Sequence, residues 1–461
     1  MDFEITDLSN YKHIHLIGIG GISMSAIAET LKNWNYKVTG SDSTKSEITD
    51  SLIQNGIDVT IGHDLGNAGI ADLIVYSAAI SEQDPEILIA KENNIPLIDR
   101  GHFVGYLTKL YKETICVAGT HGKTTTTSMI SICFVNAQKD PSIEVGALLK
   151  EINGNYRVGK SDYFILESCE YKGNFLKFFP KTEVILNIDN DHLDYYKSFD
   201  NIVKAFSDFA NLLDESGLLV TNADDENCFA LREKVKSHFI SYGIYNENAD
   251  FTAKNITFDR NGFPSFDVYK NERYYQTIEL SVAGIHNVLN ALACIAVCDY
   301  YNISKEIVFY SLKSFTGANR RLEYKGTIEG DIVIYDDYAH HPTEIKATSN
   351  AIKNKDYNES WVVFQPHTYS RTKLLLNDFA DSISDFDHII LLDIYAAREQ
   401  NTYEISSNDL ANKLKEKNKD VRYISNFDEV VSFLKENVQH NDLILTLGAG
   451  TVTNIGPMLL N

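Results

Sequence analysis

The chain has 461 residues, enough for two to four domains of ordinary size. Hydrophobic residues make up 44% of it and charged residues 23%, a composition typical of a globular protein. The formal net charge of −22 argues against binding to nucleic acid or to an anionic membrane, because their phosphates repel an acidic surface.

Cysteine usage and the beginning of the chain indicate where the protein works. The six cysteines form no CxxC pair, which favours reduced thiols over a disulfide frame or a zinc site. The first residues lack the basic start and apolar run of a signal peptide, and no run reaches the roughly 18 apolar residues of a membrane span. We expect a cytoplasmic protein with no membrane insertion.

The first hundred residues alternate between strand and helix patterns. Residues 13–21 are typical of a strand that runs into a glycine turn, and residues 22–34 carry apolar side chains at helical spacing. Further strands are expected at residues 36–42, 71–80 and 95–100. Strands separated by helix-length segments predict a parallel sheet, and therefore a Rossmann-like domain over residues 1–110.

A second α/β domain is expected over residues 111–317. The strand at residues 114–119 passes directly into a glycine loop, and residues 162–168 and 182–189 are apolar strands with polar residues at their C-terminal ends. After these come an amphipathic helix, antiparallel hairpins and a second helix, at residues 198–213, 249–282 and 284–301. The pattern predicts a P-loop ATPase-like domain with extra antiparallel strands.

The remaining residues, 318–461, predict a third domain that is again Rossmann-like α/β. Its expected strands lie at residues 331–342, 361–367, 387–395 and 442–450, and each ends in polar residues or a glycine turn.

The first glycine turn contains Gly18, Gly20 and Gly21, and Asp42 ends the next strand. This is nearly a dinucleotide fingerprint, but the third glycine of the pattern is replaced by Ser23. Glycines there let a backbone approach a pyrophosphate at a helix N-terminus. The turn alone leaves two interpretations open, a site for a nucleotide diphosphate and a simple tight turn.

A second loop, with the sequence VAGTHGKTTTT, ends like a nucleotide-binding P-loop. The common pattern has a glycine where this chain has Val117, but Gly119 lies closer to Gly122 and the loop follows an apolar strand. Lys123 is expected to contact the β- and γ-phosphates, and the Thr124 hydroxyl to ligate Mg²⁺. The alternative is a turn with a solvated lysine.

Carboxylates at neighbouring strand ends suit metal–phosphate chemistry. Glu167 ends one predicted strand and is followed by Glu170, and the next strand is followed by Asp189, Asp191, His192 and Asp194. We favour Glu167 as a metal ligand, although any of these groups could be a helix cap or a surface charge. In the third domain two polar clusters are predicted to form site walls, namely Asp336, Asp337, His340 and His341, and His367 with Arg371.

Taken in order, these motifs resemble those of the Mur ligase family over nearly the whole chain. The matching segments are HLIGIGGISMSAIAE, AGTHGKTTTT, ESCEYKGNFL, NIDNDHLDYY, GIHNVLNALA, GANRRLE, YDDYAHHPTE, FQPHTYSRT, DIYAARE and LGAGTV. The resemblance implies three domains, which bind a UDP-linked muramoyl substrate, ATP with Mg²⁺, and an amino acid.

The resemblance also implies roles for individual residues. The residues expected at the UDP-substrate are Gly18, Gly20, Gly21, Ser23, Ser41, Asp42, Ser77, Asn155 and Arg157. Those expected at ATP are Gly119, Thr120, His121, Gly122, Lys123, Thr124, Thr125, Asn287, Arg320 and Asp337. Thr124, Glu167 and His192 would hold magnesium. His341 and Arg371 would lie near the incoming amino acid and the reacting carboxylate, and are counted as catalytic with Lys123, Glu167 and His192.

The activity implied is ATP-dependent joining of L-alanine to UDP-N-acetylmuramate in peptidoglycan precursor synthesis, by a monomer or a homodimer. Ser207 stands where several relatives carry a modified lysine, and this favours the alanine-adding members over those that add later amino acids. Cys169 replaces a family aspartate, so a third metal contact is not expected there.

Two alternatives remain. A recycling ligase that adds a murein tripeptide is disfavoured by the short segment after Glu170. An NAD-dependent oxidoreductase or NAD-sensing protein would leave the second glycine loop and the third domain unexplained.

Overall fold

The computed structural model describes residues 5–397, 399–417 and 419–461. The chain divides into two compact units. The first ends at Ala249 and also includes Ala293–Ile307, and the second comprises Asp250–Leu292 and Val308–Asn461.

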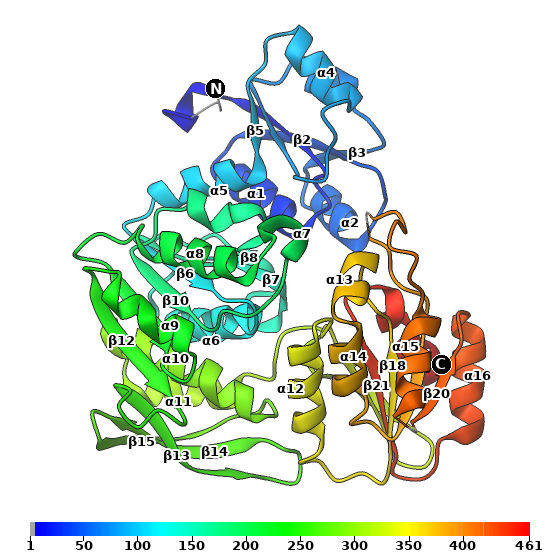
Figure 1. Cartoon of the computed structure of the whole chain (residues 1–461). Helices are drawn as coiled ribbons and strands as arrows, with labels where there is room; N and C mark the ends of the chain where they lie inside the picture. The colour runs from blue at the N-terminus through cyan, green and yellow to red at the C-terminus, as the bar shows by residue number, and fades with distance from the viewer. Residues whose placement is uncertain (1–4, 398, 418) are drawn as a thin grey trace. The chain divides into compact units, whose positions relative to one another are not determined.

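The N-terminal part of the first unit is a five-stranded sheet in the order β3-β2-β1-β4-β5, in which every neighbouring pair is parallel (Figure 1). Its strands are β1 (His13–Ile17), β2 (Lys37–Asp42), β3 (Asp58–Ile61), β4 (Leu73–Tyr76) and β5 (Leu97–Asp99). Its helices are α1 (Ile22–Asn33), α2 (Glu47–Gln54), α3 (Leu65–Ala68), α4 (Pro85–Glu92) and α5 (Arg100–Lys109). The strand order reverses beside β1, and the crevice at such a point is where open α/β sheets bind ligands.

The second sheet runs through the first unit in the order β12-β11-β10-β6-β9-β7-β8. These strands are β6 (Glu113–Ala118), β7 (Ser142–Leu149), β8 (Gly154–Arg157), β9 (Tyr163–Glu167), β10 (Thr182–Ile185), β11 (Leu218–Asn222) and β12 (His238–Gly243). The α-helices that begin in this part are α6 (Lys123–Asn136), α7 (Leu193–Tyr196), α8 (Phe199–Ala210) and α9 (Glu226–Ala230). The pairs formed by β6 with β9 and β10 are parallel, so the C-terminal ends of these three strands lie on one edge.

One apolar cluster holds the two sheets of the first unit together. Phe103 and Leu107 of α5 are buried in the same cluster as Phe175 and Phe209 of the central domain. The rings of Phe175 and Phe209 stack with centroids 4.5 Å apart. The first sheet is therefore fixed to the second through α5.

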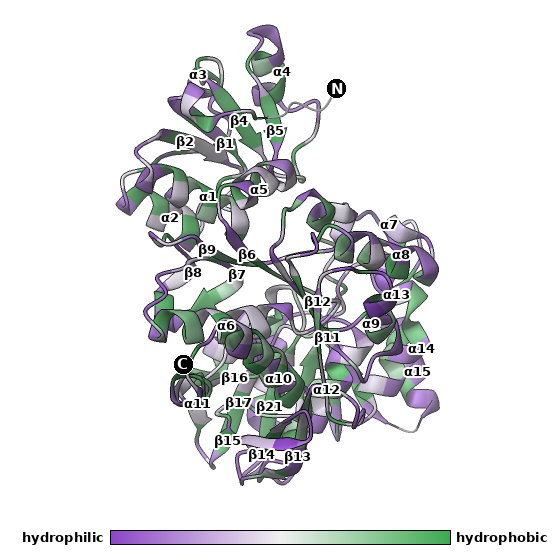
Figure 2. Cartoon of the chain, turned by 90° about the vertical axis from the view of Figure 1, so that its left-hand side faces the viewer, coloured by the Kyte–Doolittle hydropathy of each residue, from purple (hydrophilic) through white to green (hydrophobic). Residues whose placement is uncertain are grey.

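The second unit begins with an antiparallel meander of β13 (Phe251–Phe258), β14 (Pro264–Lys270) and β15 (Arg273–Glu279). Helix α10 (Ile285–Tyr300) spans the boundary at Leu292 and is drawn largely in the hydrophobic colour in Figure 2. Helix α11 (Lys305–Ser314) follows it. The predicted antiparallel hairpins are thus confirmed.

The C-terminal sheet has the order β16-β17-β21-β18-β19-β20, and β16 is its antiparallel edge. Its strands are β16 (Glu323–Ile328), β17 (Ile332–Asp337), β18 (Ser360–Phe364), β19 (His388–Leu391), β20 (Asp420–Tyr423) and β21 (Leu443–Leu447). Its helices are α12 (Pro342–Ile352), α13 (Tyr369–Leu374), α14 (Leu376–Ile383), α15 (Ser407–Glu416), α16 (Phe427–Asn437) and α17 (Ile455–Leu460).

Both faces of this sheet are covered, because successive side chains of β18 enter different cores. Val362 and Phe364 pack with Phe379 of α14, whereas Trp361 and Val363 pack with residues of α16. The predicted fold class, three α/β domains with a parallel N-terminal sheet, is confirmed. The boundaries 1–110, 111–317 and 318–461 stay predictions.

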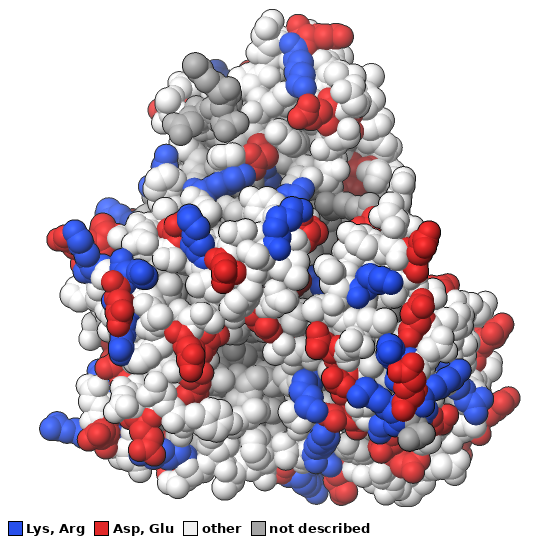
Figure 3. All heavy atoms as spheres, viewed as in Figure 1, with Lys and Arg blue, Asp and Glu red and all other residues white. Residues whose placement is uncertain are grey.

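Two properties of the whole chain accompany this fold. Among the described residues, no helix combines the length and the apolar character needed to cross a bilayer. On the face drawn in Figure 3, basic side chains are interspersed with acidic ones.

Candidate active site

The phosphate loop joins β6 to α6 and is shaped by two glycines with positive φ. Gly119 has φ 139° and Gly122 has φ 83°, angles that residues with side chains rarely adopt. Gly122 begins α6 and has no side chain to cap it, and a helix N-terminus of this kind attracts anions. The loop therefore has the geometry of a phosphate cradle.

Residues that follow β10 brace this loop. Asn187 exchanges two hydrogen bonds with the backbone of His121, of 2.8 and 2.9 Å, and its carbonyl accepts the N–H of Thr120 at 3.1 Å. Asp189 Oδ2 lies 2.9 Å from His121 Nε2. Asn187 is not among the residues predicted for the site, although its place at the end of a predicted strand was a signal.

Lys123 is the charged centre of the loop. Its Nζ lies 3.0 Å from Glu170 Oε2 and its side chain is only 13% exposed. Burial of the ammonium lowers the pKa of Lys123, but the neighbouring negative groups, Glu170 first among them, together outweigh burial and the net shift is upward. Lys123 is therefore a permanent cation at the mouth of the loop.

Thr124 and Glu167 form a pair of oxygen donors next to Lys123. Thr124 Oγ1 donates to Glu167 Oε2 at 2.9 Å, and the N–H of Gly146 on β7 donates to the same oxygen at 2.9 Å. Hydroxyl and carboxylate oxygens are the ligands that Mg²⁺ prefers. The donor set thus fits a magnesium ion whose other ligands would be water and phosphate oxygens.

His192 begins α7 with a positive φ of 56°, and its ring packs against Tyr171 with centroids 4.7 Å apart. Its Nε2 lies 3.6 Å from Glu170 Oε1 and 3.8 Å from Asp191 Oδ2. Of the predicted site residues, the structure brings together Lys123, Thr124, Glu167 and His192, with Glu170 between the lysine and the histidine.

The first glycine turn is held by backbone and carboxylate contacts. The N–H groups of Gly18 and Ile19 both donate to the carbonyl of Ser41, at 2.8 and 3.0 Å, and Gly20 N donates to Asp42 Oδ2 at 2.9 Å. The hydroxyl of Ser41 is buried and donates to Glu86 at 2.7 Å. Here Ser41 and Asp42 support the turn, and their predicted contacts with a UDP group stay predictions.

Other predicted UDP contacts lie around this turn. A Cβ added to Gly18 would lie 3.1 Å from Ser77 Cβ, so Ser77 adjoins the turn. Asn155 Nδ2 donates to the carbonyl of Ile22 at 2.8 Å. Arg157 is instead paired with Asp140 at 2.5 Å, away from these contacts.

A series of side-chain hydrogen bonds connects the first domain to β7. Ser23 Oγ donates to Glu144 Oε1 and accepts from Arg100 Nη1 at 3.0 Å. Burial raises the pKa of Glu144. Glu144 and Gly146 are alternate residues of β7, so one strand contacts both Ser23, in the first turn of α1, and Glu167.

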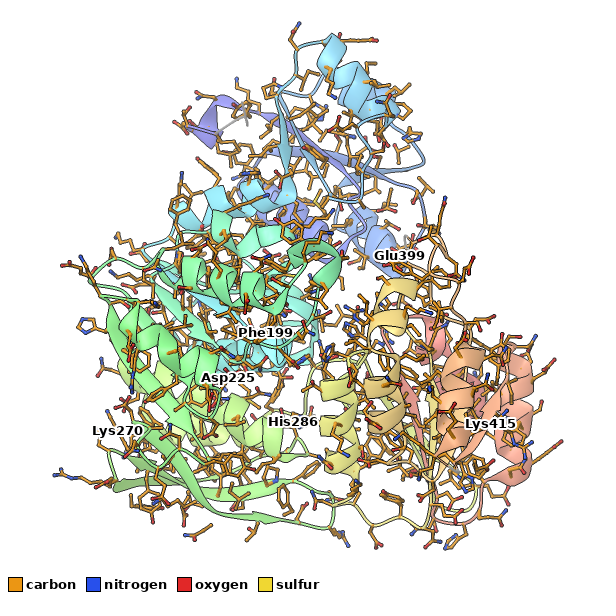
Figure 4. The ribbon with its side chains drawn as sticks, in the orientation of Figure 1. Phe199, Asp225, Lys270, His286, Glu399 and Lys415 are labelled. Atoms are coloured by element: carbon orange, nitrogen blue, oxygen red, sulfur yellow. The ribbon has the colours of Figure 1, made fainter. Side chains whose placement is uncertain are left out.

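The second unit carries the remaining predicted residues. Asn287 lies in the first turn of α10, where it donates to the carbonyl of Ala283 at 2.8 Å and accepts from Asn290 at 2.9 Å. His286 precedes it and is labelled in Figure 4. Burial lowers the pKa of His286 to about 4, which keeps its ring neutral.

Arg320 and Asp337 lie at the C-terminal ends of β17 and β21. Arg320 pairs with Asp336 at 3.1 Å and donates to the carbonyl of Gly448 at 2.5 Å. Asp337 accepts the N–H groups of Leu322 and Ala339, both at 2.7 Å. Burial raises the pKa of Asp337 to about 6.

His341 and Arg371 stand on neighbouring helices of the same domain. His341 caps α12, because its Nδ1 accepts the N–H of Thr343 at 3.3 Å. Arg371 Nη1 lies 3.0 Å from His367 Nδ1. The backbone N–H and the hydroxyl of Ser370 both donate to Glu399, which is labelled in Figure 4. Arg398 of the same segment lies outside the described residues.

Comparison with known proteins places this geometry in a family. The Mur ligase family catalytic domain matches residues 13–112, the Mur ligase middle domain matches residues 117–298, and the Mur ligase glutamate ligase domain matches residues 320–450. A UDP-N-acetylmuramate–L-alanine ligase from Clostridium tetani is 50% identical over 460 residues, which cover 100% of both chains. The chain belongs to the Mur ligase family.

Solved structures agree with this assignment. The UDP-N-acetylmuramate–alanine ligase of Thermotoga maritima superposes on this Mur ligase with a TM-score of 0.83 and 29% identity over 98% of each chain. A murein peptide ligase from Psychrobacter arcticus has a TM-score of 0.74 at 23% identity, over 97% of this chain and 98% of its own, and so shares the fold. The oxidoreductase alternative is excluded, because the first glycine turn belongs to a Mur ligase domain.

Proposed function

We propose that this Mur ligase joins L-alanine to the lactyl carboxylate of UDP-N-acetylmuramate. The products are UDP-N-acetylmuramoyl-L-alanine, ADP and phosphate. The observation that carries the proposal is the phosphate loop, in which Lys123 and the Thr124–Glu167 pair share one edge of the sheet. The full-length identity of 50% to a protein of that name supports the choice of substrates.

The chemistry explains why ATP is needed. A carboxylate is a poor acyl donor, because oxide is a poor leaving group. Transfer of the γ-phosphate of ATP to the lactyl carboxylate gives an acyl phosphate, and the amine of L-alanine attacks it and expels phosphate. Such a reaction depends mainly on positioning and charge stabilisation, so no covalent enzyme nucleophile is required.

The residues of the first unit would perform the phosphoryl step. Lys123 neutralises phosphate charge, and the N-terminus of α6 orients the phosphates. Thr124 and Glu167 would hold one magnesium ion and His192 a second, and these ions would neutralise the developing negative charge. Asn287, Arg320 and Asp337 are proposed to contact the nucleotide.

Two adjacent histidines are candidates for accepting the proton of the alanine amine. His340 Nδ1 lies 3.0 Å from the carbonyl of Tyr338, which can only accept, so the neutral ring carries its hydrogen on Nδ1 and a lone pair on Nε2. The Nδ1 lone pair of His341 is engaged by Thr343. We therefore propose that His340 accepts the proton of the alanine amine. His341 and Arg371 are proposed to lie near the alanine and the reacting carboxylate.

The test is phosphate release with UDP-N-acetylmuramate, ATP and Mg²⁺ and a panel of acceptors. We expect turnover with L-alanine and little with later amino acids of the peptide or with a murein tripeptide. Higher kcat/KM with the tripeptide would instead make the chain a recycling ligase. Both nucleotide substrates are cytoplasmic, so we place the reaction in the cytoplasm.

A further inference from the structure

Glu170 is a buried carboxylate between Lys123 and His192. Its side chain is only 2% exposed, and its oxygens lie 3.0 and 3.3 Å from Lys123 Nζ. Its Oε1 is also 3.6 Å from His192 Nε2. The hydroxyl of Tyr196 donates to the Glu170 carbonyl at 2.5 Å and fixes the backbone at this point.

The ammonium of Lys123 has three hydrogens, and the structure gives each of them an acceptor. Nζ donates to the carbonyl of Gly119 at 2.5 Å, to the carbonyl of Thr120 at 3.0 Å, and to Glu170. The two carbonyls belong to the loop backbone and stay in place. A phosphate can therefore reach Lys123 only by replacing Glu170.

We propose that Glu170 is a positioning residue that serves as the counter-anion of Lys123 when no nucleotide is bound and exchanges places with the nucleotide phosphate. When phosphate takes Lys123, the Glu170 carboxylate is left beside His192, where it adds a negative charge to the expected second metal position. The inference rests on the proposed binding of ATP at this loop. Glu170 thereby couples nucleotide binding to metal binding.

This exchange predicts opposite effects with and without metal. In the absence of metal the carboxylate competes with phosphate for Lys123, so removing its charge strengthens nucleotide binding. With Mg²⁺ present the same carboxylate helps to hold the cation. Removing its charge therefore reduces the increase in nucleotide affinity that Mg²⁺ causes. Couplings of this kind change affinity by roughly 5-fold or more.

The experiment is isothermal titration calorimetry of the full chain with ADP and with ATP, in EDTA and in Mg²⁺. We expect Glu170→Gln to bind ADP about 5-fold tighter than the wild type in EDTA and to show a smaller Mg²⁺ enhancement of ATP binding. Glu170→Asp keeps the charge on a shorter side chain and should lie between the two. Glu183→Gln is the matched control, because Glu183 is also a buried carboxylate and burial alone shifts its pKa.

Metal-free affinity of Glu170→Gln equal to or weaker than that of the wild type would overturn the exchange. If the wild type itself binds neither ADP nor ATP, the proposed function fails first. A structure of the wild-type protein with ADP and no metal tests the inference without any variant. Lys123 should then contact phosphate in place of Glu170, and a retained Lys123–Glu170 pair would contradict the proposal.

Discussion

At the scale of single residues, Lys123 gives the most direct test of the phosphate loop. We expect Lys123→Ala to lower turnover by roughly 10²–10³-fold, because a preorganised charge at the transferred phosphoryl group is lost. Binding of UDP-N-acetylmuramate should be unchanged, since its predicted site lies around the first glycine turn. Phosphate release and calorimetry measure the two effects.

The control for that variant is Lys112→Ala. Lys112 is an exposed lysine one residue before β6 and pairs with Asp162 at 2.9 Å. Near-normal turnover in Lys123→Ala would remove the phosphate-loop assignment, and reduced turnover in Lys112→Ala would show that loss of any lysine has the same effect.

Glu183 is not among the proposed site residues. Because it is buried, it is expected to affect the stability of the folded state. Its register partners Cys116 and Leu219 belong to an apolar core, and neither of its side-chain oxygens has a hydrogen-bond partner among the described residues. Burial raises the pKa of Glu183 well above its usual value. The folded state therefore loses stability as pH rises above the usual pKa of about 4.5 toward the raised pKa.

We expect Glu183→Leu to raise the free energy of unfolding by about 1–3 kcal/mol at pH 8, with a smaller gain at pH 5. Glu183→Gln keeps a polar group of the same shape and should mainly flatten the pH dependence. Urea titrations at the two pH values measure both effects, and an equal gain at pH 5 and pH 8 would contradict the burial argument.

In the C-terminal sheet, His388 has the opposite character to Glu183, because hydrogen-bonded partners stabilise its charged form. Burial of the ring lowers its pKa, but hydrogen bonds of 2.8 Å to Glu359 and 3.0 Å to Asp420 outweigh burial and raise it. A raised pKa stabilises the fold below the usual value of about 6.5, and this contribution is lost as pH rises through the raised pKa.

We expect His388→Gln to lower the melting temperature more at pH 6 than at pH 9. The ring also stacks on Trp361 with centroids 3.9 Å apart, so part of the loss is independent of pH. If the melting temperature fell by the same amount at both pH values, the stacking on Trp361 alone would explain the loss, and the ion pairs would contribute nothing.

At the scale of elements, Gly146 on β7 sets the position of Glu167, the proposed metal ligand. A Cβ at this position would lie 2.6 Å from Glu167 Oε2, so Gly146→Ala must displace that carboxylate. We expect the Mg²⁺ concentration for half-maximal activity to rise roughly 10-fold. A metal titration of phosphate release measures it.

The matched control is Gly154→Ala in the neighbouring strand β8. A Cβ there would meet its nearest atom at 3.8 Å, an ordinary contact, so the metal titration should match the wild type. If Gly146→Ala also matched the wild type, Glu167 would not be a metal ligand at this position.

The strands that could be predicted from the sequence differ physically from those that could not. The strands β6, β9 and β10 are buried apolar runs followed by polar residues, and both the fold and the candidate site follow from them. By contrast β3, β8, β16 and β20 are edge strands, half-exposed and with weak patterns. Strand β11 is a short buried run, which periodicity alone cannot distinguish from a helix.

The same limit applies to the site. Lys123, Thr124 and Glu167 could be predicted from one loop motif and one strand end. The roles of Asn187, Glu170 and Glu144 depend on which strands lie side by side, and a single sequence does not contain that information.

At the scale of the whole molecule, one compact unit contains both the meander of β13–β15 and the C-terminal sheet. The turn between β13 and β14 bonds to the residues after α12, where Lys355 Nζ donates to the carbonyl of Asn261 at 2.7 Å. Lys355 also lies over the ring of Tyr335 at 4.7 Å. The meander thus packs with the C-terminal sheet, although in sequence it belongs to the central domain.

We expect Lys355→Ala to speed hydrogen exchange of the backbone in residues 251–279 while leaving the N-terminal sheet unaffected. Lys353→Ala is the control, since that lysine forms an exposed pair with Asp385 and such pairs contribute little. Equal exchange in the two variants would mean that other contacts hold the meander.

Strand β7 has a consequence for how accurately the reaction must be aligned. Glu144 bonds to Ser23, which follows the glycine turn and is proposed to contact the UDP-sugar, and Gly146 bonds to Glu167, which is proposed to hold the metal of ATP. These two residues are separated by one strand repeat, about 7 Å along a backbone that stretches very little. If both proposed sites are correct, the length of this strand segment limits how far apart the phosphoryl donor and its acceptor can lie, before alanine takes part.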